Sequence, residues 1–322
     1  MASKSQSIQV GPLRKDELPE AGRIVRLAFG TFLGLPNPLE FMDDRDFMTP
    51  RWHARNTAVL AAREGRKLIA SNVITRWGSF GFFGPLTVLP EYWSRGVAQQ
   101  LLAATVKVFN RWGVRHTGLF TFASSPKHVG LYQKFGYWPG SLTALMKYAP
   151  QPSVPIPARN AKAPVHLSAL SLRERKQAIA ACAALAGTIG KGLDLSDEIR
   201  AVLVQHTGEV ILTYGQRSLD AFAICMNGAG TEGGTKTCYI KFAAARGGSG
   251  AEQRFTRLLE AVEALALTRE AEVEAGVNLA CEEAYCRMQS RGYRAFTLGV
   301  AMHCPRGPAF TRAGAYVLGD WR

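Results

Sequence analysis

Residues 84–102 read GPLTVLPEYWSRGVAQQLL, a pattern that indicates a buried strand, a turn of small residues and the start of a helix. Pro90 ends the β-rich run. Gly96 and Ala98 add almost no side-chain bulk to the turn. An apolar stripe at helical spacing follows, at Val97, Leu101, Leu102, Thr105, Val108 and Phe109. Because the unpaired N–H groups and the dipole of a helix's first turn favour an anion, this stretch predicts a pyrophosphate-binding turn.

A second motif lies at residues 130–137, which read GLYQKFGY. Together the two motifs resemble the GNAT acetyltransferase superfamily, in which a strand holds the pantetheine arm of acetyl-CoA and a loop binds its pyrophosphate. In that family a later helix ends in Leu-Tyr-x-x-x-Gly-Phe. The resemblance covers nearly all of residues 7–148 and implies an α/β fold with a mixed sheet. It also implies an enzyme that moves the acetyl group of acetyl-CoA directly to an amine, without a metal.

The resemblance assigns the coenzyme-binding residues. It implies that Leu86, Thr87 and Val88 line the pantetheine arm, and that Gly96-Val97-Ala98 supplies half of the family's Arg/Gln-x-x-Gly-x-Gly/Ala loop. This sequence departs from the pattern at two positions. Trp93 stands at the first loop position, so one coenzyme contact is missing unless Arg95 replaces it. Ser125 stands where many members carry an Asn that helps to hold the coenzyme.

Tyr132 is the predicted general acid. The family's Tyr at this motif position commonly faces the coenzyme sulfur, and a phenol with a pKa of about 10 is protonated at neutral pH. The alternative is that Tyr132 only packs against the sheet. No general base stands out, because Glu91, His128 and the acidic residues Glu40, Asp43, Asp44 and Asp46 are equally consistent with a solvated surface.

Composition limits the class of protein. A chain of 322 residues with 47% hydrophobic and 20% charged residues is long enough for two globular domains. It contains neither an apolar run of membrane-spanning length nor a hydrophobic signal core, so no membrane partner and a cytoplasmic location are expected. The six cysteines include no Cys-x-x-Cys pair, so neither a zinc site nor a disulfide framework is predicted.

The net charge of +14 is unevenly distributed. Residues 1–150 carry 19 Lys and Arg against 9 Asp and Glu, whereas residues 151–322 carry 20 against 16. A positive field around the predicted site would speed capture of the anionic coenzyme. A generally basic surface is the alternative, and nucleic acid is not expected as a partner because no nucleic-acid-reading motif is present.

Four prolines between Ala149 and Ala158 predict a semi-rigid connector. We therefore expect a catalytic domain at residues 1–150, a linker at 151–164 and a second domain at 165–322. The first domain is predicted to contain strands at 7–12, 66–77, 79–89, 116–122 and 141–148, and helices at 15–33, 45–63, 96–112 and 126–135.

A similar order of elements returns after the linker. Helices are expected at 171–186, 194–206, 251–268 and 281–290, and strands at 209–215, 219–227, 236–244, 272–279 and 294–303. We interpret this as a degenerate second copy of the GNAT-like fold. Its glycine-rich turn at residues 246–252 lacks the loop spacing, and Met288 stands where the first copy has Tyr132.

The sequence leaves the acceptor open. An amine on a small molecule is favoured, because a second fused domain would close off the acceptor side. The alternatives are an acyl-CoA-binding regulatory module without transferase activity, or an acetyltransferase that acts on a protein or RNA.

Overall fold

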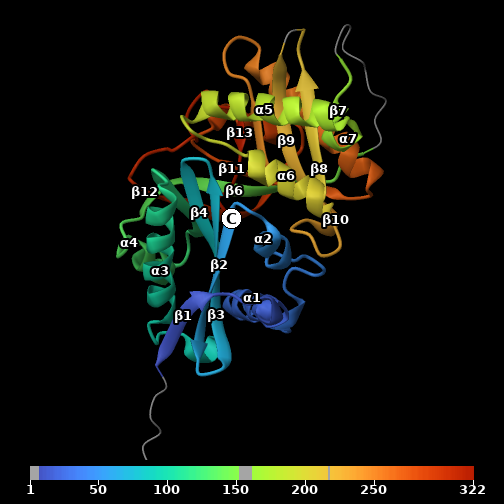
Figure 1. Ribbon diagram of the computed structural model, residues 1–322. Helices are drawn as coiled ribbons and strands as arrows, with labels where there is room; N and C mark the ends of the chain where they lie inside the picture. The colour runs from blue at the N-terminus through green and yellow to red at the C-terminus, as the bar shows by residue number, and fades with distance from the viewer. Residues whose placement is uncertain (1–6, 152–161, 217) are drawn as a thin grey trace, which may run out of the picture.

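The computed structural model describes residues 7–151, 162–216 and 218–322. Most of the predicted linker, residues 152–161, lies outside the described residues. In Figure 1 the first half of the chain (blue to green) lies below the second half (yellow to red), and the end marked C lies at their junction. Within the described ranges, no helix combines the length and the apolar character needed to cross a bilayer.

The first half follows the expected order of elements closely. They are β1 (Ile8–Pro12), η1 (Lys15–Glu17), α1 (Leu18–Phe32), η2 (Pro38–Glu40), α2 (Thr49–His53), β2 (Thr57–Glu64), β3 (Lys67–Trp77), β4 (Phe80–Val88), η3 (Pro90–Tyr92), α3 (Val97–Trp112), β5 (His116–Phe122), α4 (Pro126–Gln133) and β6 (Trp138–Tyr148). Helices α1 and α3 lie on opposite sides of these strands (Figure 1).

The helix predicted over residues 45–63 is wrong. The structure has only the short α2 there, and residues 57–64 form β2. Strand β2 pairs with β1 on one edge and with β3 on the other, and its central residues 59–62 are all buried. A strand covered on both faces has a continuous apolar run, which local periodicity does not distinguish from a buried helix.

The second half also follows the expected order. Its elements are β7 (Val165–His166), η4 (Leu167–Ala169), α5 (Leu172–Ile189), α6 (Ser196–Gln205), β8 (Gly208–Tyr214), β9 (Leu219–Gly228), β10 (Gly234–Ala245), α7 (Ala251–Thr268), β11 (Glu272–Asn278), α8 (Glu282–Ser290), β12 (Arg294–Cys304) and β13 (Val317–Leu318). The short strands β7 and β13 were not predicted.

One mixed sheet runs through both halves, in the order β1-β2-β3-β4-β5-β12-β6-β11-β10-β9-β8-β7. The strands β6 and β12 are exchanged between the halves: β6 pairs with β11 of the second half, and β12 pairs with β5 of the first. The halves of the sequence are therefore interleaved in space, and neither has a complete sheet of its own.

Two hydrophobic cores each lie mainly in one half, and a third joins the halves. Trp77, Phe80 and Phe82 of the first half pack in it with residues of α5 and α6, and Trp321 closes it from the end of the chain described. Side chains of α7 and α8 form the core on the other face of the second-half strands. The junction is therefore as well buried as the interior of either half.

Candidate active site

A cavity of about 1110 Å³ lies where β4 and β5 separate. The two strands pair only over residues 80–82 and 116–118. Beyond that point, residues 83–88 of β4 and 120–122 of β5 line the cavity. It extends from the predicted phosphate turn to the junction between the halves.

The predicted phosphate turn, residues 93–98, has the open backbone geometry that its small residues favour. Gly96 is the N-cap of α3 with φ 77°, and Ser94 just before it also has a left-handed φ of 64°. A Cβ at Gly96 would meet only the Gln99 side chain, at 3.5 Å. Gly96, Val97 and Ala98 all line the cavity. The N–H groups of the first helical turn, which have no acceptor within the helix, therefore lie at its wall.

The predicted pantetheine strand lines the same cavity. Leu86, Thr87 and Val88 are among its wall residues. The pairing of β4 with β3 is irregular just before them, since Phe83 lies opposite Ile74 and Leu86 lies opposite Asn72. This bulge leaves residues of β4 unpaired, so that backbone groups of this strand can face a ligand.

Tyr132 lies on α4 with its side chain 8% exposed, at the wall of the cavity and against the ring of Phe83. Its hydroxyl makes no hydrogen bond to another of the described residues. Burial raises the pKa of Tyr132 above its ordinary value. The phenol is therefore protonated at neutral pH, as a proton donor must be.

Arg95 and Ser125 lie outside the cavity wall. The Arg95 guanidinium stacks over the ring of Tyr92, 5.0 Å from its centroid. Ser125 is the N-cap of α4, and its carbonyl accepts the N–H groups of His128 and Val129. Trp93 does line the cavity, and its Nε1 donates to the Val88 carbonyl at 2.7 Å, so it fastens the turn to the end of β4.

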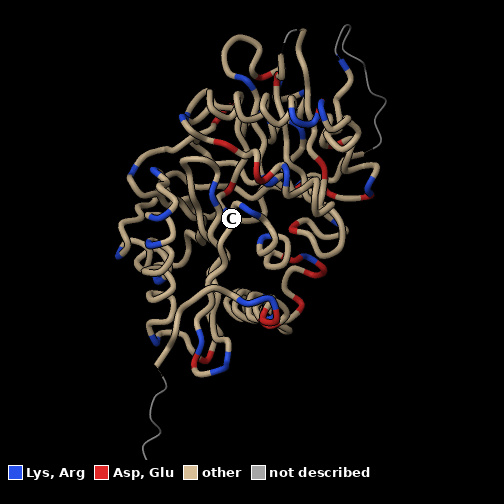
Figure 2. Tube along the Cα trace, in the orientation of Figure 1, with Lys and Arg blue, Asp and Glu red and all other residues tan. Residues whose placement is uncertain are grey.

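Two lysines that sequence reasoning did not assign to the site line the cavity from α4. Lys127 Nζ donates to Ser94 Oγ at 3.2 Å, which brings a cation to the phosphate turn, and Lys134 is the C-cap residue at the other end of the helix. Residues 92–173 contain no Asp or Glu. Figure 2 accordingly shows blue without red along α3 and α4. The sequence feature that could have indicated this contact is Lys127 itself, a cation near the start of the helix that contains the second motif.

The candidate bases separate into two groups. Glu40, Asp43, Asp44 and His128 line the cavity. Burial and the charge of Lys127 lower the pKa of His128, so the imidazole is neutral at physiological pH. Glu91 and Asp46 do not line it. Glu91 pairs with Lys67 at 3.2 Å, and Asp46 accepts the N–H groups of Met48 and Thr49 at the start of α2.

The second half completes the far end of the cavity, which sequence analysis expected only in general terms. Its contribution consists of Gly233, Lys236, Thr237, Glu272, Glu274, Phe296, Thr297, Trp321 and Arg322. Glu274 is 1% exposed and lies between two guanidinium groups, with Arg45 Nη2 at 2.9 Å and Arg322 Nη2 at 3.0 Å. Burial raises the pKa of Glu274, but the charges of Arg322 and Arg45 outweigh it and hold the pKa at about 2.

The second half's own counterpart of the phosphate turn is filled by a side chain. Arg254 donates to the carbonyls of Arg246, Gly247 and Ser249, at 2.9, 3.4 and 2.6 Å. Met288 is fully buried in a hydrophobic core. No group of residues suited to hold a metal ion occurs in the described part of the chain.

Residues 27–137, which include the phosphate turn and Tyr132, match the family model of the acetyltransferase (GNAT) family. The chain therefore carries a GNAT acetyltransferase domain. Members of this family transfer acyl groups from acyl-CoA, and this is the class of reaction that the match indicates. No curated protein matches the sequence.

Three solved structures share the architecture of the whole chain. A Pyrococcus horikoshii protein described as an acetyltransferase is 14% identical with a TM-score of 0.70, over 98% of this chain and 95% of its own. A tandem GNAT protein from the clavulanic acid biosynthesis pathway is 12% identical with a TM-score of 0.58, over 94% and 99%. A GCN5-related N-acetyltransferase from Sphaerobacter thermophilus is 11% identical with a TM-score of 0.53, over 92% and 95%. The predicted tandem GNAT fold is thus confirmed.

Proposed function

We propose that this protein is an N-acetyltransferase that moves the acetyl group of acetyl-CoA directly to the amine of a small molecule. The observation that carries the proposal is the single cavity that joins the phosphate turn, the Tyr132 side chain and a far end built by both halves. In this proposal residues 1–150 bind the coenzyme, and residues 165–322 complete the acceptor end.

The coenzyme fits the residues on its side of the cavity. The open turn at Gly96 and the first-turn N–H groups of α3 suit a pyrophosphate, and Lys127 adds a positive charge beside them. We propose that Leu86, Thr87 and Val88 hold the pantetheine arm. Arg95 and Ser125 act indirectly in this proposal, through Tyr92 and through the start of α4.

Tyr132 is the proposed general acid. Its hydroxyl is protonated, and its side chain lies on the cavity wall against Phe83 of β4. A proton from Tyr132 would neutralise the thiolate of coenzyme A as it departs. Glu40, Asp43 and Asp44 would attract a cationic amine to the far end of the cavity.

Calorimetric titration with acetyl-CoA and a thiol-release assay on a panel of small amines test the proposal together. Binding with amine-dependent thiol release is the expected result. Binding without release by any amine would instead favour an acyl-CoA-binding regulatory module. Absence of binding would contradict both functions.

A further inference from the structure

In the second half, a segment of the chain itself fills the opening that forms the cavity in the first half. Strands β10 and β11 pair over residues 237–240 and 272–275 and then separate, as β4 and β5 do. Strand β13 lies in the opening, with Leu318 opposite Ala243 and Val317 opposite Ala244. On the other side, the Gly319 N–H donates to the Gly276 carbonyl at 3.0 Å. We call residues 316–322 the filling segment.

The filling segment is tightly fitted. A Cβ at Gly276 would lie 2.2 Å from the Asp320 Cβ, so only glycine allows this approach. Tyr239 donates its hydroxyl to Asp320 at 3.0 Å. Trp321 is 1% exposed and stacks on Phe310 with ring centroids 4.8 Å apart. Its φ of 61° is uncommon for a bulky residue, and such a conformation persists only where the surroundings fix it.

The fit of the filling segment places Arg322 at the end of the cavity that the second half completes. Its main-chain oxygen accepts a hydrogen bond from Arg51 of the first half at 2.9 Å. Its side chain donates to Asp320 at 2.8 Å and to Glu274 at 3.0 Å. Glu274 in turn accepts from Arg45 of the first half at 2.9 Å. Arg322 is therefore connected through one buried carboxylate to a residue of the opposite half.

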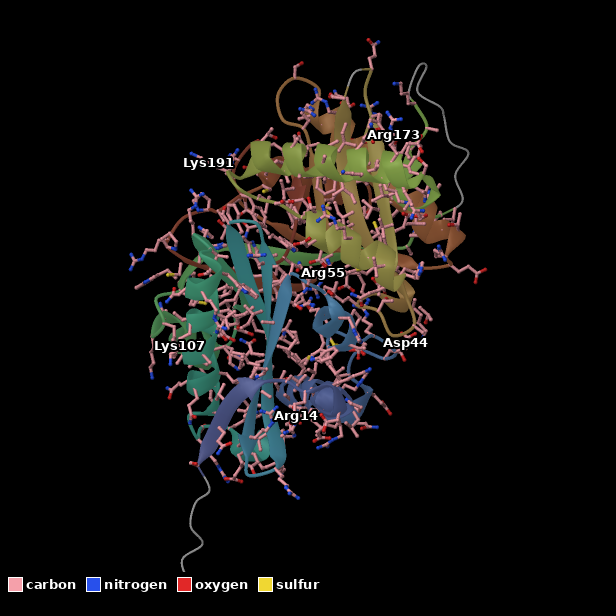
Figure 3. All side chains as sticks on the ribbon, viewed as in Figure 1. Arg14, Asp44, Arg55, Lys107, Arg173 and Lys191 are labelled. Atoms are coloured by element: carbon pink, nitrogen blue, oxygen red, sulfur yellow. The ribbon has the colours of Figure 1, made fainter. Side chains whose placement is uncertain are left out.

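Arg45 belongs to a loop at residues 40–46 that lines the cavity, here called the covering loop. Arg26 of α1 donates to the carbonyls of Phe41, Asp43 and Arg45 in this loop. The second half also holds the loop, since the Thr235 N–H donates to Asp44, which Figure 3 labels. Met42 and Asp43 both have left-handed φ angles, 72° and 51°. A loop in this conformation depends on its anchors.

We propose that the filling segment acts as a built-in ligand of the second half, and that Arg322 is a positioning residue which fixes the covering loop through Glu274 and Arg45. The second opening is consequently closed to a coenzyme. In this proposal Arg322 acts on the acceptor end, because the hydrogen bonds of its side chain go to Asp320 and Glu274 of the second half. The activity part of this proposal rests on the proposed function, whereas its conformational part does not.

Hydrogen–deuterium exchange of the covering loop tests the conformational part on the full chain. In Arg322→Ala, amides of residues 40–46 should exchange roughly tenfold faster, because Glu274 loses one of its two charged partners. Arg322→Lys should recover part of the protection. The matched control is Arg306→Ala, an exposed arginine that stacks on Trp138 and does not line the cavity. Exchange in α3 provides the internal reference for global unfolding.

Arg45→Ala approaches the same connection from the other half and remains informative if Arg322→Ala does not fold. Both arginines contact Glu274, and Arg45 also donates to Thr237 at 2.8 Å, so the double variant should exchange little faster than Arg45→Ala alone. Unchanged exchange of the covering loop in both single variants would overturn the proposal, as would fully additive effects.

Two further measurements separate this proposal from the proposed function. Titration with coenzyme A should give one site per chain, with equal affinity in the parent protein and in Arg322→Ala, whereas two sites per chain would overturn the filled opening. On an amine that the parent acetylates, Arg322→Ala should raise the acceptor KM roughly tenfold with kcat nearly unchanged. Absence of coenzyme binding would contradict the proposed function, and the exchange result would still decide the role of Arg322.

Discussion

Tyr132 is the residue on which the proposed chemistry most depends, and removal of its hydroxyl tests the assignment directly. Tyr132→Phe keeps the ring that packs on Phe83 and removes only the proton. We expect kcat to fall by roughly one to three orders of magnitude, with coenzyme affinity nearly unchanged. Tyr137→Phe is the matched control, since Tyr137 is also buried against Phe83 but does not line the cavity. If Tyr132→Phe turned over at the parental rate at every accessible pH, Tyr132 would be a packing residue and not the general acid.

Gly96 tests the coenzyme site in the same way. Its left-handed φ of 77° and the open space at its Cβ position place any added side chain in the turn itself. Gly96→Glu should abolish binding of coenzyme A, because the carboxylate adds bulk and a charge of the same sign as the phosphates. Gly113→Glu is the control: Gly113 caps the other end of α3 with φ 64° and open space around it. Equal affinity of the two variants in a calorimetric titration would refute the phosphate turn.

At the scale of elements, α4 contributes more than the motif that predicts it. Lys127, near the start of α4, precedes the motif at residues 130–137, and its side chain contacts Ser94 in the phosphate turn. Lys127→Ala should weaken coenzyme A binding by roughly tenfold at low salt and by less at high salt, since the contribution of a solvent-accessible charge is screened. Lys107→Ala on α3, labelled in Figure 3, is the control with the same change in net charge. Equal affinities for the two variants would remove Lys127 from the site.

The elements that could be predicted are those whose boundaries and buried faces are marked by neighbouring residues in the sequence. Helix α3 was predicted within a residue of its observed bounds because Gly96 marks its start and the apolar residues that follow at helical spacing face one core. Strand β2 was missed because burial on both faces erases the periodicity of two residues. Gly96, Tyr132 and the pantetheine strand belong to one contiguous stretch and could be assigned. No local sequence pattern predicts contacts between residues that are far apart in the chain. The contacts of Glu274, of Arg322 and of the filling segment are of this kind.

At the scale of the whole molecule, a buried ionic cluster joins the halves. Arg51 of the first half pairs with Glu232 of the second at 2.7 Å, and Lys241 contacts both Glu232 and Glu198, at 2.6 and 2.7 Å. All four side chains are 1–3% exposed. Burial raises the pKa of Glu232, but Arg51 and Lys241 outweigh this effect and lower it to about 2, from an ordinary 4.5. Its stabilising contribution is therefore complete above pH 4.5 and is lost as the pH falls toward 2.

Glu232→Gln should destabilise the protein by about 3–5 kcal/mol at neutral pH, because it takes the charged partner from the buried Arg51 and leaves the buried Lys241 with Glu198 alone. The difference from the parent should narrow as the pH falls through that window, because Glu232 of the unfolded parent takes up a proton there that the folded carboxylate, with its pKa at about 2, does not. Urea denaturation at pH 7 and at pH 3 measures both quantities. Glu91→Gln removes a charge from an exposed pair with Lys67 and should change stability by no more than about 1 kcal/mol. A neutral-pH loss no greater than that of this control would show that the cluster does not hold the halves together.

Because β6 and β12 are exchanged between the halves, we expect that neither half folds correctly without the other. Residues 1–150 alone would leave β5 without β12 and would leave β6 with no neighbouring strand. They would also expose Trp77, Phe80 and Phe82, which the second half covers. We therefore expect this fragment to show no cooperative thermal transition and no acetyl transfer, and we expect residues 151–322 alone to be inactive.

Because β6 ends at Tyr148 and β7 begins at Val165, no strand of the described residues spans the boundary between the fragments, so co-expression should restore the strand pairing that separation removes. The two fragments should co-purify as a 1:1 complex, melt in one transition and bind coenzyme A with parental affinity, since every strand then regains its neighbours. Introducing Glu232→Gln into the second fragment should weaken this association, because it takes away the partner of Arg51 across the junction. A cooperative, fully active fragment of residues 1–150 would show instead that β12 and the shared core are dispensable, and that the second half is an independent module.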